Sequence, residues 1–421
     1  MKYSKDKTIL FIMPRLPFPS ISGRKTSLYH YCRILSEELG YRLVVASFLE
    51  HSDDPSLKPK FIDRLVILDK PSSGEKIKSI LIKSFIQSQY PLQVSLFYNK
   101  NVTYRIKELV EEEKPVAVIA DMVRCTEYIK NLDCFTIADL DDRISLRYKR
   151  QLESDVDSIN SYGAFLGSLP YIAQKIALWK PIKLPVLKKE ISLLNKYELS
   201  VGARSNATVF VAQKEAEAFN NELGENKAIA IPNGVDTDYF HNDYKPKQEN
   251  AIAFLGAMNV AHNENAVLNF INNIYPRIKS QINDVVFYVI GGGVTERLKG
   301  YESKDIRFTG RVEDVREYLQ KCKVFVCPMT FGSGIKTKNL EAMSFSMPVV
   351  TTSVGAENIN AKNGEDWFVE DDNDKFAHKV CEILSDSELE KKIGTKAREF
   401  ILENFSWNVA REQFEKLLRD K

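Results

Sequence analysis

Short runs of consecutive apolar residues alternate with amphipathic stretches along almost the whole chain. Most of these runs are a few residues long, rich in Val, Ile and Phe, and bounded by Gly or Pro, which is typical of β-strands. The predicted strands are residues 7–15, 42–48, 64–69, 116–121, 135–140, 228–233, 251–256, 285–292, 306–310, 324–329 and 348–352. Between most of them the apolar positions recur with helical spacing, as in residues 25–39.

This alternation of strands and helices predicts an α/β fold. Strands that are apolar on both faces need cover on both faces, which favours parallel sheets between layers of helices. Right-handed crossovers between parallel strands then produce doubly wound, Rossmann-like halves. Because 421 residues exceed the usual size of one core, we expect two domains. Residues 197–219 have a helix-strand-helix pattern and lead into a polar stretch, where we place the boundary, near residue 225.

The composition is that of a globular protein with a nearly neutral charge. The formal net charge of +2 argues against a dedicated nucleic-acid-binding protein, which would be far more basic. No apolar run reaches the ~20 residues of a membrane-spanning helix, and the first apolar stretch is too short for a signal peptide. None of the six cysteines forms a CxxC pair, so we expect buried, reduced thiols and a cytoplasmic location.

Residues 324–352 carry the most informative chemical pattern. A predicted strand is followed by a loop of small residues that includes Ser333 and Gly334, and a helix then begins near Lys336. Glycine lets backbone N–H groups approach an anion closely, and a helix N-terminus contributes about half a positive charge. Lys336 and Lys338 add full charges beside that helix start. Together these groups predict a diphosphate-binding site.

A carboxylate follows on the same predicted helix. Glu341 lies about one turn beyond Lys338, so both side chains can reach the same ligand. A carboxylate in this position is suited to accept hydrogen bonds from ribose hydroxyls. From the pattern alone, an ordinary turn between a strand and a helix, with two surface lysines and an exposed glutamate, is the alternative.

Several segments in a fixed order resemble the group 1 glycosyltransferases, family four of the GT-B fold. Residues 324–352 are similar to the donor-site motif of that family, and residues 231–240 are similar to the start of its C-terminal domain. The other matching segments are residues 251–278, 285–293 and 306–326. The resemblance extends over roughly residues 229–405 and is looser in the N-terminal half.

The resemblance implies a two-domain architecture. Two doubly wound, Rossmann-like domains are expected to face each other across a cleft. Residues 1–225 would bind the acceptor, residues 226–404 would bind the donor nucleotide, and a C-terminal helix, residues 405–421, would rejoin the N-terminal domain.

The same resemblance implies roles for individual residues of the donor site. Glu341 corresponds to the second Glu of the family's E-x7-E motif, which binds the donor ribose, and Ser333 stands where the first Glu would be. Relatives without that first Glu often have the pattern GSG-x-x-x-K, in which Lys338 is the lysine and Gly334 belongs to the donor-binding loop. Gly310 and its neighbours resemble the loop that contacts the nucleobase through backbone groups.

One departure from the family concerns charge. The family often has an Arg and a Lys that clamp the diphosphate, and the corresponding residues here are Ala257 and Asn263. Stabilisation of the charge that develops on the leaving diphosphate is the main catalytic requirement. We expect Lys336 and Lys338 to supply it, as in the subset of bacterial polysaccharide transferases that also lacks the pair.

In the N-terminal half, residues 11–27 form a strand, a proline-rich loop and a helix start. They resemble the family's first loop, whose glycines approach the donor phosphates from the opposite domain, which makes Gly23 a donor-binding candidate. Arg24 and Lys25 follow it and are candidates to replace part of the missing charge. A helix cap with two solvated basic residues is the alternative.

Residues 135–150 place three carboxylates at the end of a predicted strand. Asp141 stands where the family commonly has a catalytic-cleft His, and Asp142 stands at the Asp that follows it. Such a carboxylate could accept the proton of an acceptor hydroxyl or orient that hydroxyl. A helix N-cap with an acidic first turn is the alternative. A metal site at Asp139 and Asp141 is disfavoured, because it would lie away from the diphosphate motif and the family usually works without metal.

Residues 168–194 mix aromatic and aliphatic residues with five lysines. Basic amphipathic segments that contain Trp suit an anionic membrane surface, where a lipid-linked acceptor would be presented. The alternative is a pair of packing helices broken by Pro181 and Pro185, with a solvated basic face.

The sequence therefore predicts a retaining glycosyltransferase of the hexosyltransferase type. It would transfer a sugar from a nucleoside-diphosphate sugar to a glycan or lipid-linked acceptor in cell-surface polysaccharide biosynthesis. Retention comes from the resemblance alone, and no metal or other cofactor is expected. We expect a cytoplasmic protein with peripheral contact to the inner face of the plasma membrane. A catalytically weak partner or scaffold protein, or a sugar-nucleotide epimerase or phosphorylase of the same fold, are the alternatives. Neither the sugar, base, acceptor and linkage nor the oligomeric state follows from the sequence.

Overall fold

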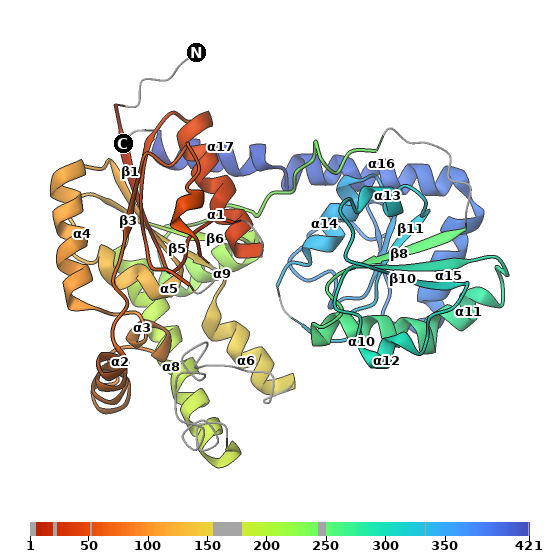
Figure 1. Ribbon diagram of the computed structural model, residues 1–421, viewed down its shortest axis with the longest axis horizontal. Coiled ribbons are helices and arrows are strands. Elements are labelled where there is room, and N and C mark those ends of the chain that lie inside the picture. Colours follow the sequence, from red (N-terminus) through yellow and green to blue (C-terminus); the bar gives the residue numbers. More distant parts are fainter. Residues whose placement is uncertain are drawn as a thin grey trace. The chain divides into compact units, whose positions relative to one another are not determined.

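The computed structural model describes residues 6–19, 23–50, 53–154, 179–242, 250–332, 334–419 and 421. The chain divides into two units, of which the first comprises Met1–Pro232 and Ala410–Lys421 and the second comprises Asn233–Val409. Each unit has its own parallel sheet (Figure 1). Each also has its own apolar core.

The first unit is built on a seven-stranded sheet with the order β3-β2-β1-β4-β5-β6-β7, in which all neighbouring strands are parallel. The strands are β1 (Thr8–Met13), β2 (Arg42–Ser47), β3 (Arg64–Ile67), β4 (Ala117–Asp121), β5 (Phe135–Asp141), β6 (Ala207–Phe210) and β7 (Ala228–Ala230). The helices used below are α1 (Gly23–Arg33), α2 (Ser73–Ser79), the π-helical η3 (Ile80–Ile86), α3 (Leu92–Ser95), α4 (Lys100–Glu113), α5 (Met122–Cys125), α6 (Ile144–Ser154), α8 (Lys180–Arg204), α9 (Gln213–Leu223) and α17 (Trp407–Leu418).

The second unit is built on a six-stranded parallel sheet with the order β10-β9-β8-β11-β12-β13. The strands are β8 (Ala251–Leu255), β9 (Val286–Ile290), β10 (Ile306–Gly310), β11 (Val324–Cys327), β12 (Val349–Thr351) and β13 (Phe368–Val369). The helices are α10 (Ala261–Asn269), η7 (Phe270–Ile274), α11 (Tyr275–Lys279), α12 (Glu296–Lys299), α13 (Arg316–Leu319), α14 (Thr337–Ser344), α15 (Asn373–Ser385) and α16 (Ser387–Asn404).

The two sheets share one topology, and the predicted α/β fold with doubly wound units is confirmed. In each sheet the winding reverses at one point, between β1 and β4 in the first unit and between β8 and β11 in the second. Ligands of doubly wound folds bind outside the carboxyl ends of the strands at such a switch point. Ligand sites are therefore expected at the loops that follow β1, β4 and β5 and at those that follow β8 and β11.

The apolar runs became strands because they are buried on both faces. All six residues of β1 are buried, and so are all residues of β4, β9, β11 and β12. The strand that the apolar pattern did not reveal is β13, because it has only two residues and pairs at the edge beside β12.

The structure divides the chain at Pro232 rather than near residue 225. The reason is that β7 pairs in parallel with β6 and so belongs to the first sheet. At the other end the chain rejoins the first unit at Ala410, within α17, rather than at residue 405. There the ring of Phe414 lies edge-on to that of Tyr31 in α1.

Two glycines hold the backbone together at the carboxyl ends of β8 and β9. The N–H of Gly256 donates to the carbonyl of Ile290 at 2.9 Å. Gly291 has a φ of 137°, and a Cβ atom there would lie 2.0 Å from the carbonyl oxygen of Gly256. The close approach of the two strand ends therefore requires a residue without a side chain at position 291.

We expect Gly291→Ala to lower the free energy of unfolding by about 3 kcal/mol or more, because the added methyl overlaps a backbone carbonyl and the φ value is strained for alanine. Urea unfolding followed by circular dichroism measures the change. Gly300→Ala is the matched control, since a Cβ atom at Gly300 meets nothing within 4 Å and its φ is ordinary. Equal stability of the two variants would contradict the packing argument.

Candidate functional site

The loop between β11 and α14 contains the glycines of the predicted diphosphate site. Gly332 and Gly334 have φ values of 130° and 75°, which other residues rarely adopt, so the loop turns sharply into the helix. The N–H of Gly334 donates to a carboxylate oxygen of Glu357 at 2.9 Å. An internal anion is thus bound to one of the amides predicted to face a phosphate. Ser333 lies outside the described residues.

Lys336 and Lys338 are both drawn in from solvent. Lys336 is 7% exposed, and its ammonium donates to the carbonyl of Gly334 at 2.7 Å. Burial lowers the pKa of Lys336, against the opposing effect of Glu357. The ammonium of Lys338 lies 4.3 Å from the centre of the Phe254 ring, and burial lowers the pKa of Lys338 to about 8. Two partly desolvated cations therefore lie at the start of α14.

Asn263 holds Lys338 in place. Its side-chain oxygen accepts a hydrogen bond from the Lys338 ammonium at 2.6 Å, and its amide donates to the carbonyl of Ala257 at 2.9 Å. A Cβ atom at Gly256 would come within 2.9 Å of both the Asn263 amide and the Lys338 ammonium. The sequence marked Asn263 only as a substitution of a family lysine. Its role as the partner of Lys338 emerges only from the structure.

Glu341 follows one turn later on α14, as predicted from the spacing. Burial raises the pKa of Glu341 to about 7, while Lys338 opposes the shift. Within the described residues, its carboxylate has no hydrogen-bond partner, and Lys338 forms no ion pair with it or with another acid. The pair therefore offers one free carboxylate and one cation that lacks an anion.

Two further residues lie at the same carboxyl edge. The carbonyl of Gly310, at the end of β10, accepts from the N–H of Gly291 at 3.1 Å, so the predicted base-contacting glycine is part of this edge. His262 precedes Asn263 and was not predicted as a site residue. Burial, together with the charges of Lys338 and Lys336, lowers its pKa and favours the neutral imidazole. A basic environment therefore extends from α14 to the start of α10.

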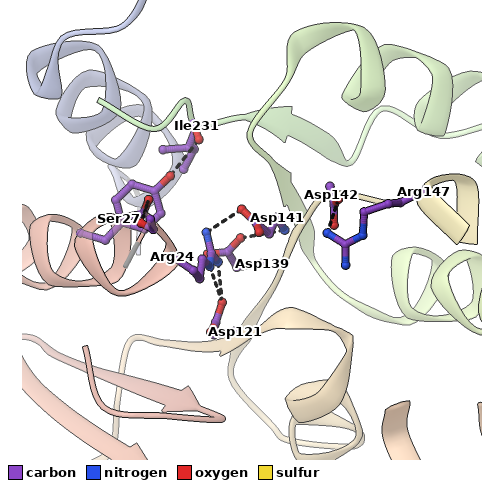
Figure 2. Close-up of polar contacts among 10 residues, drawn as sticks. Arg24, Ser27, Asp121, Asp139, Asp141, Asp142, Arg147 and Ile231 are labelled. Carbon is purple, nitrogen blue, oxygen red and sulfur yellow. Dashed lines mark hydrogen bonds and ion pairs between the residues drawn. The ribbon is translucent and has the colours of Figure 1, made fainter. Parts of the chain in front are cut away.

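In the first unit, Arg24 is the centre of a group of three aspartates. The group, here called the acidic cluster, consists of Asp121, Asp139 and Asp141 (Figure 2). The guanidinium of Arg24 donates to Asp121 at 3.0 Å, to Asp139 at 2.7 Å and to Asp141 at 3.0 Å. Asp121 is the last residue of β4, and Asp139 and Asp141 are among the last three residues of β5. Arg24 lies in the first turn of α1. The cluster thus occupies the switch point of the first sheet.

Burial controls the charges of the acidic cluster. It raises the pKa of Asp139 to about 7; Arg24 opposes this shift, and Asp121 and Asp141 add to it. Burial also raises the pKa of Asp121, and one of its carboxylate oxygens is buried without a hydrogen-bond partner. Although burial works against the charged form of Arg24, the three aspartates raise its pKa well above the ordinary value. One guanidinium therefore supports three carboxylates.

The backbone at Asp141 is unusual. Its φ is 66°, the N–H of Asp142 donates to the carbonyl of Leu140 at 2.8 Å, and the register of β5 against β6 shifts between Asp139 and Asp141. Irregularities of this kind re-aim a side chain and are common near active sites. The N–H of Asp141 also donates to the carboxylate of Asp139 at 3.2 Å. The result is that Asp141, 21% exposed in its side chain, points toward Arg24 (Figure 2).

The N-terminal candidates thus have other partners than the sequence suggested. Arg24, considered for the donor phosphates, binds the acidic cluster, and Lys25 is buried in an ion pair with Asp53. Gly23 begins α1. Asp142 is separate from Asp141 and pairs with Arg147 of α6 at 2.7 Å; burial raises its pKa to about 7. Asp121 was missed, although an aspartate at the end of an apolar strand beside β5 was the available signal.

The basic segment 168–194 is only partly described, since residues 168–178 lie outside the described residues. Its second part is the start of one continuous helix, α8, which Pro181 and Pro185 do not break. Lys183 is buried, and the carboxylate of Glu190 accepts from the N–H of Leu92 at 2.6 Å at the start of α3. This part of α8 therefore packs against other elements of the first unit. Among the described helices, none is long and apolar enough to cross a membrane.

A known protein family matches a large part of the second unit. Residues 249–386 match the model of the family described as glycosyl transferases group 1. A 44.6 kDa protein of the cps region of Klebsiella pneumoniae is 28% identical over 43% of this chain and 49% of its own length. The capsular polysaccharide biosynthesis glycosyltransferase CapM of Staphylococcus aureus is 24% identical over 47% of this chain and 57% of its own length. The chain thus spans about half the length of these relatives.

A solved structure extends the fold to the whole chain. The Anabaena protein HepE, in complex with UDP, has a TM-score of 0.66 at 12% identity, and the match covers 98% of this chain and 100% of that chain. At this identity the likeness concerns the fold alone. Residues 249–386 are thus similar to the group 1 glycosyl transferases, and the chain has the GT-B fold.

The pKa of Lys338 leads to a prediction about anion binding. We expect the affinity for inorganic pyrophosphate to fall as the pH rises through about 8, because the ammonium that attracts the anion loses its proton there. The sign is that of a base: the stabilising charge is present below its pKa and lost above it. Isothermal titration at several pH values measures the effect. Lys338→Arg should remove the fall, since a guanidinium stays charged, and an unchanged profile in that variant would contradict the assignment.

Removal of Arg24 should destabilise the first unit in a pH-dependent way. We expect Arg24→Gln to cost about 3–5 kcal/mol of unfolding free energy near neutral pH, because the buried carboxylates of Asp121 and Asp139 lose their cation. The loss should shrink on acidification, since the aspartates then take up protons. Urea unfolding at two pH values measures both effects. Arg411→Gln, which removes an exposed arginine paired with Glu415, is the control and should change little.

Proposed function

We propose that this chain, which carries a group 1 glycosyltransferase domain on a GT-B fold, is a glycosyltransferase of the hexosyltransferase type. It transfers a sugar from a nucleoside-diphosphate sugar to a glycan or lipid-linked acceptor in cell-surface polysaccharide biosynthesis, with retention at the anomeric carbon. The observation that carries the proposal is the Lys338 ammonium, desolvated at the start of α14 and without an anion among the described residues.

The donor diphosphate is the ligand that these groups suit best. Its charge would restore to Lys336 and Lys338 the solvation that burial removes, and the N-terminus of α14 adds its partial charge. The free carboxylate of Glu341 accepts hydrogen bonds from the ribose. The loop that contains Ser333 and Gly334 binds the phosphates, and Gly310 contacts the base through its backbone. A phosphate oxygen at the Gly334 amide would take the place of Glu357.

Lys338 also has a catalytic role in this proposal. When the bond between sugar and diphosphate breaks, negative charge grows on the leaving oxygen, and a preformed cation in a partly dry site stabilises that charge. Asn263 keeps the ammonium in one position before the donor arrives, so little reorganisation is needed. This arrangement supplies the charge that the family's Arg and Lys, here Ala257 and Asn263, would otherwise provide.

On the acceptor side we assign Asp141 to orient the attacking hydroxyl. In a retaining reaction the leaving phosphate itself can take the acceptor's proton, so a group that orients the hydroxyl is sufficient. Asp141 is the partly exposed member of the acidic cluster, and its carboxylate accepts a hydrogen bond from Arg24 at 3.0 Å. Asp142 supports this turn through Arg147, and Gly23 lets the start of α1 approach a substrate.

We propose that the reaction needs no metal. The aspartates that resemble a metal-binding pattern, Asp139 and Asp141, both accept hydrogen bonds from Arg24. A divalent cation at this place would have to displace the guanidinium. The charge of the leaving diphosphate is met by Lys336 and Lys338 instead.

Relatives support the choice of substrates without fixing them. CapM is named for capsular polysaccharide biosynthesis, and HepE was solved with UDP. A capsule or similar polymer is built at a membrane, which agrees with a cytoplasmic enzyme in peripheral contact with the lipid surface.

A donor-binding protein with little turnover is the second candidate. It is favoured by the absence of the family's Arg and Lys and by the carboxylate of Glu357 at the Gly334 amide, where a phosphate is expected. Such a protein would bind the donor but neither hydrolyse it nor transfer its sugar.

The test is a thermal-shift screen of nucleoside-diphosphate sugars, followed by assays for transfer and hydrolysis. A bound donor raises the melting temperature by mass action, and a donor that does so should also release nucleoside diphosphate with an acceptor present. Lys338→Ala and Glu341→Ala should each lose about tenfold or more in donor affinity or turnover, since charged hydrogen bonds contribute ~1.5–3 kcal/mol.

The matched control is Lys299→Ala, which removes an exposed lysine of the same unit. Normal kinetics in both site variants would remove the site assignment. Donor binding without any release of nucleoside diphosphate would favour the second candidate.

A further inference from the structure

One continuous segment of the first unit exposes a row of large apolar side chains. Of the eleven large apolar side chains that are exposed among the described residues, four lie on α2 and η3. Ile77 is 45% exposed, Leu81 54%, Phe85 38% and Ile86 77%. The first three recur every four residues and therefore follow one side of the segment. This row, here called the apolar row, is unusual for the surface of a soluble protein.

The apolar row is accompanied by positive charge. Residues 70–89 contain four lysines, Lys70, Lys76, Lys78 and Lys83, and a single acidic residue. That residue, Glu75, is engaged by the backbone and hydroxyl of Ser72 in the cap of α2. Burial and the neighbouring charge of Lys70 lower the pKa of Lys76, so the lysines lie close enough to repel one another.

The segment that carries the apolar row is anchored to the protein. Ser84 is buried, and its hydroxyl forms a hydrogen bond of 2.8 Å with that of Ser95 in α3. The ammonium of Lys189, in α8, donates to the carbonyl of Phe85 at 2.8 Å and lies over the Phe85 ring. α8 thus lies beside the end of η3, and Figure 1 shows α2 and α8 at the same end of the first unit. The apolar row is held outward by a packed segment.

We propose that α2 and η3 form a docking surface for an anionic lipid bilayer, with the apolar row inserted between the lipid headgroups and the surrounding lysines at the phosphates. A helical segment with large apolar residues on one side, lysines beside them and few acidic residues has the composition of an interfacial helix. Anionic headgroups attract lysines within a Debye length of the surface.

A bilayer fits this surface better than a protein partner does. The exposed side chains form a row along one side of the segment, and four lysines with one engaged glutamate match a uniformly negative surface. Trp179, at the start of α8 in the same unit, is 61% exposed, and tryptophan favours the interface between headgroups and acyl chains. The docking surface on α2 and η3 therefore differs from the basic segment, residues 168–194, that the sequence indicated.

The experiment is co-sedimentation of the full chain with vesicles of phosphatidylcholine, with and without phosphatidylglycerol, in the absence of donor and acceptor. We expect binding to the anionic vesicles that weakens as salt is added, and little binding to phosphatidylcholine alone. Leu81→Glu should lower the partition coefficient by about tenfold, because it places a charge among the inserted side chains.

Two matched controls separate this surface from general hydrophobicity and net charge. Leu57→Glu changes a leucine of the same unit that is 55% exposed, close to the 54% of Leu81, and should bind vesicles like the wild type. Lys78→Glu should weaken binding and flatten its salt dependence. Lys107→Glu, which alters the net charge equally at an exposed lysine of α4, should have a smaller effect. Thermal unfolding confirms that each variant is folded.

The proposal is overturned if the wild type ignores anionic vesicles, or if Leu81→Glu and Leu57→Glu bind them equally. A concentration-dependent dimer that Leu81→Glu abolishes, without vesicle binding, would assign the apolar row to a second copy of the chain instead. The inference extends the proposed function but is tested apart from it: vesicle binding needs no catalysis, and turnover on a soluble acceptor should be unchanged in Leu81→Glu. A wild-type chain that binds anionic vesicles but transfers no sugar would count against the proposed function only.

Discussion

A lysine ammonium that is removed from water without an ion-pair partner is unfavourable, and the second unit supports one at Lys338, which forms no ion pair with any described residue. The cost is limited by the oxygen of Asn263, by the face of Phe254 and by the absence of a side chain at Gly256, which leaves room for both groups. Each of these residues is fixed by the way β8, β9 and β11 end side by side. The parallel sheet thus creates the site that a diphosphate would complete.

The first unit repeats the topology with the opposite charge. Its switch point holds three aspartates around Arg24, and Asp141 reaches the surface through a left-handed turn. A sheet of one design thus presents a cationic edge in one unit and an anionic, arginine-supported edge in the other. The same backbone geometry is compatible with both charges, because polar sites of doubly wound folds lie at the carboxyl ends of the strands and the side chains there determine the sign.

Charge on this chain is organised locally, and the net value of +2 conceals that organisation. Lysines gather at the start of α14 and again along α2 and η3, while aspartates gather at β4 and β5. The buried groups are supported by specific partners, whereas Lys78 of α2 is exposed beside the apolar row. Partner geometry separates a binding site from a docking surface here, because the residue types are the same in both.

The apolar pattern alone was sufficient to predict two α/β halves with parallel sheets, since residues buried on both faces must be apolar in any packing. The loop before α14 could also be predicted, as could the placement of Lys338 and Glu341 one turn apart on that helix, because a helix fixes the spacing of near neighbours. The partners of Arg24 were not readable: Asp121 and Asp139 lie about a hundred residues away, and the sheet order decides that they meet. For the same reason only the folded chain reveals Asn263 as the partner of Lys338, and β7 as part of the first sheet. Local spacing is written in the sequence, whereas contacts between distant segments depend on how strands are ordered, and that order follows from the packing of the whole unit.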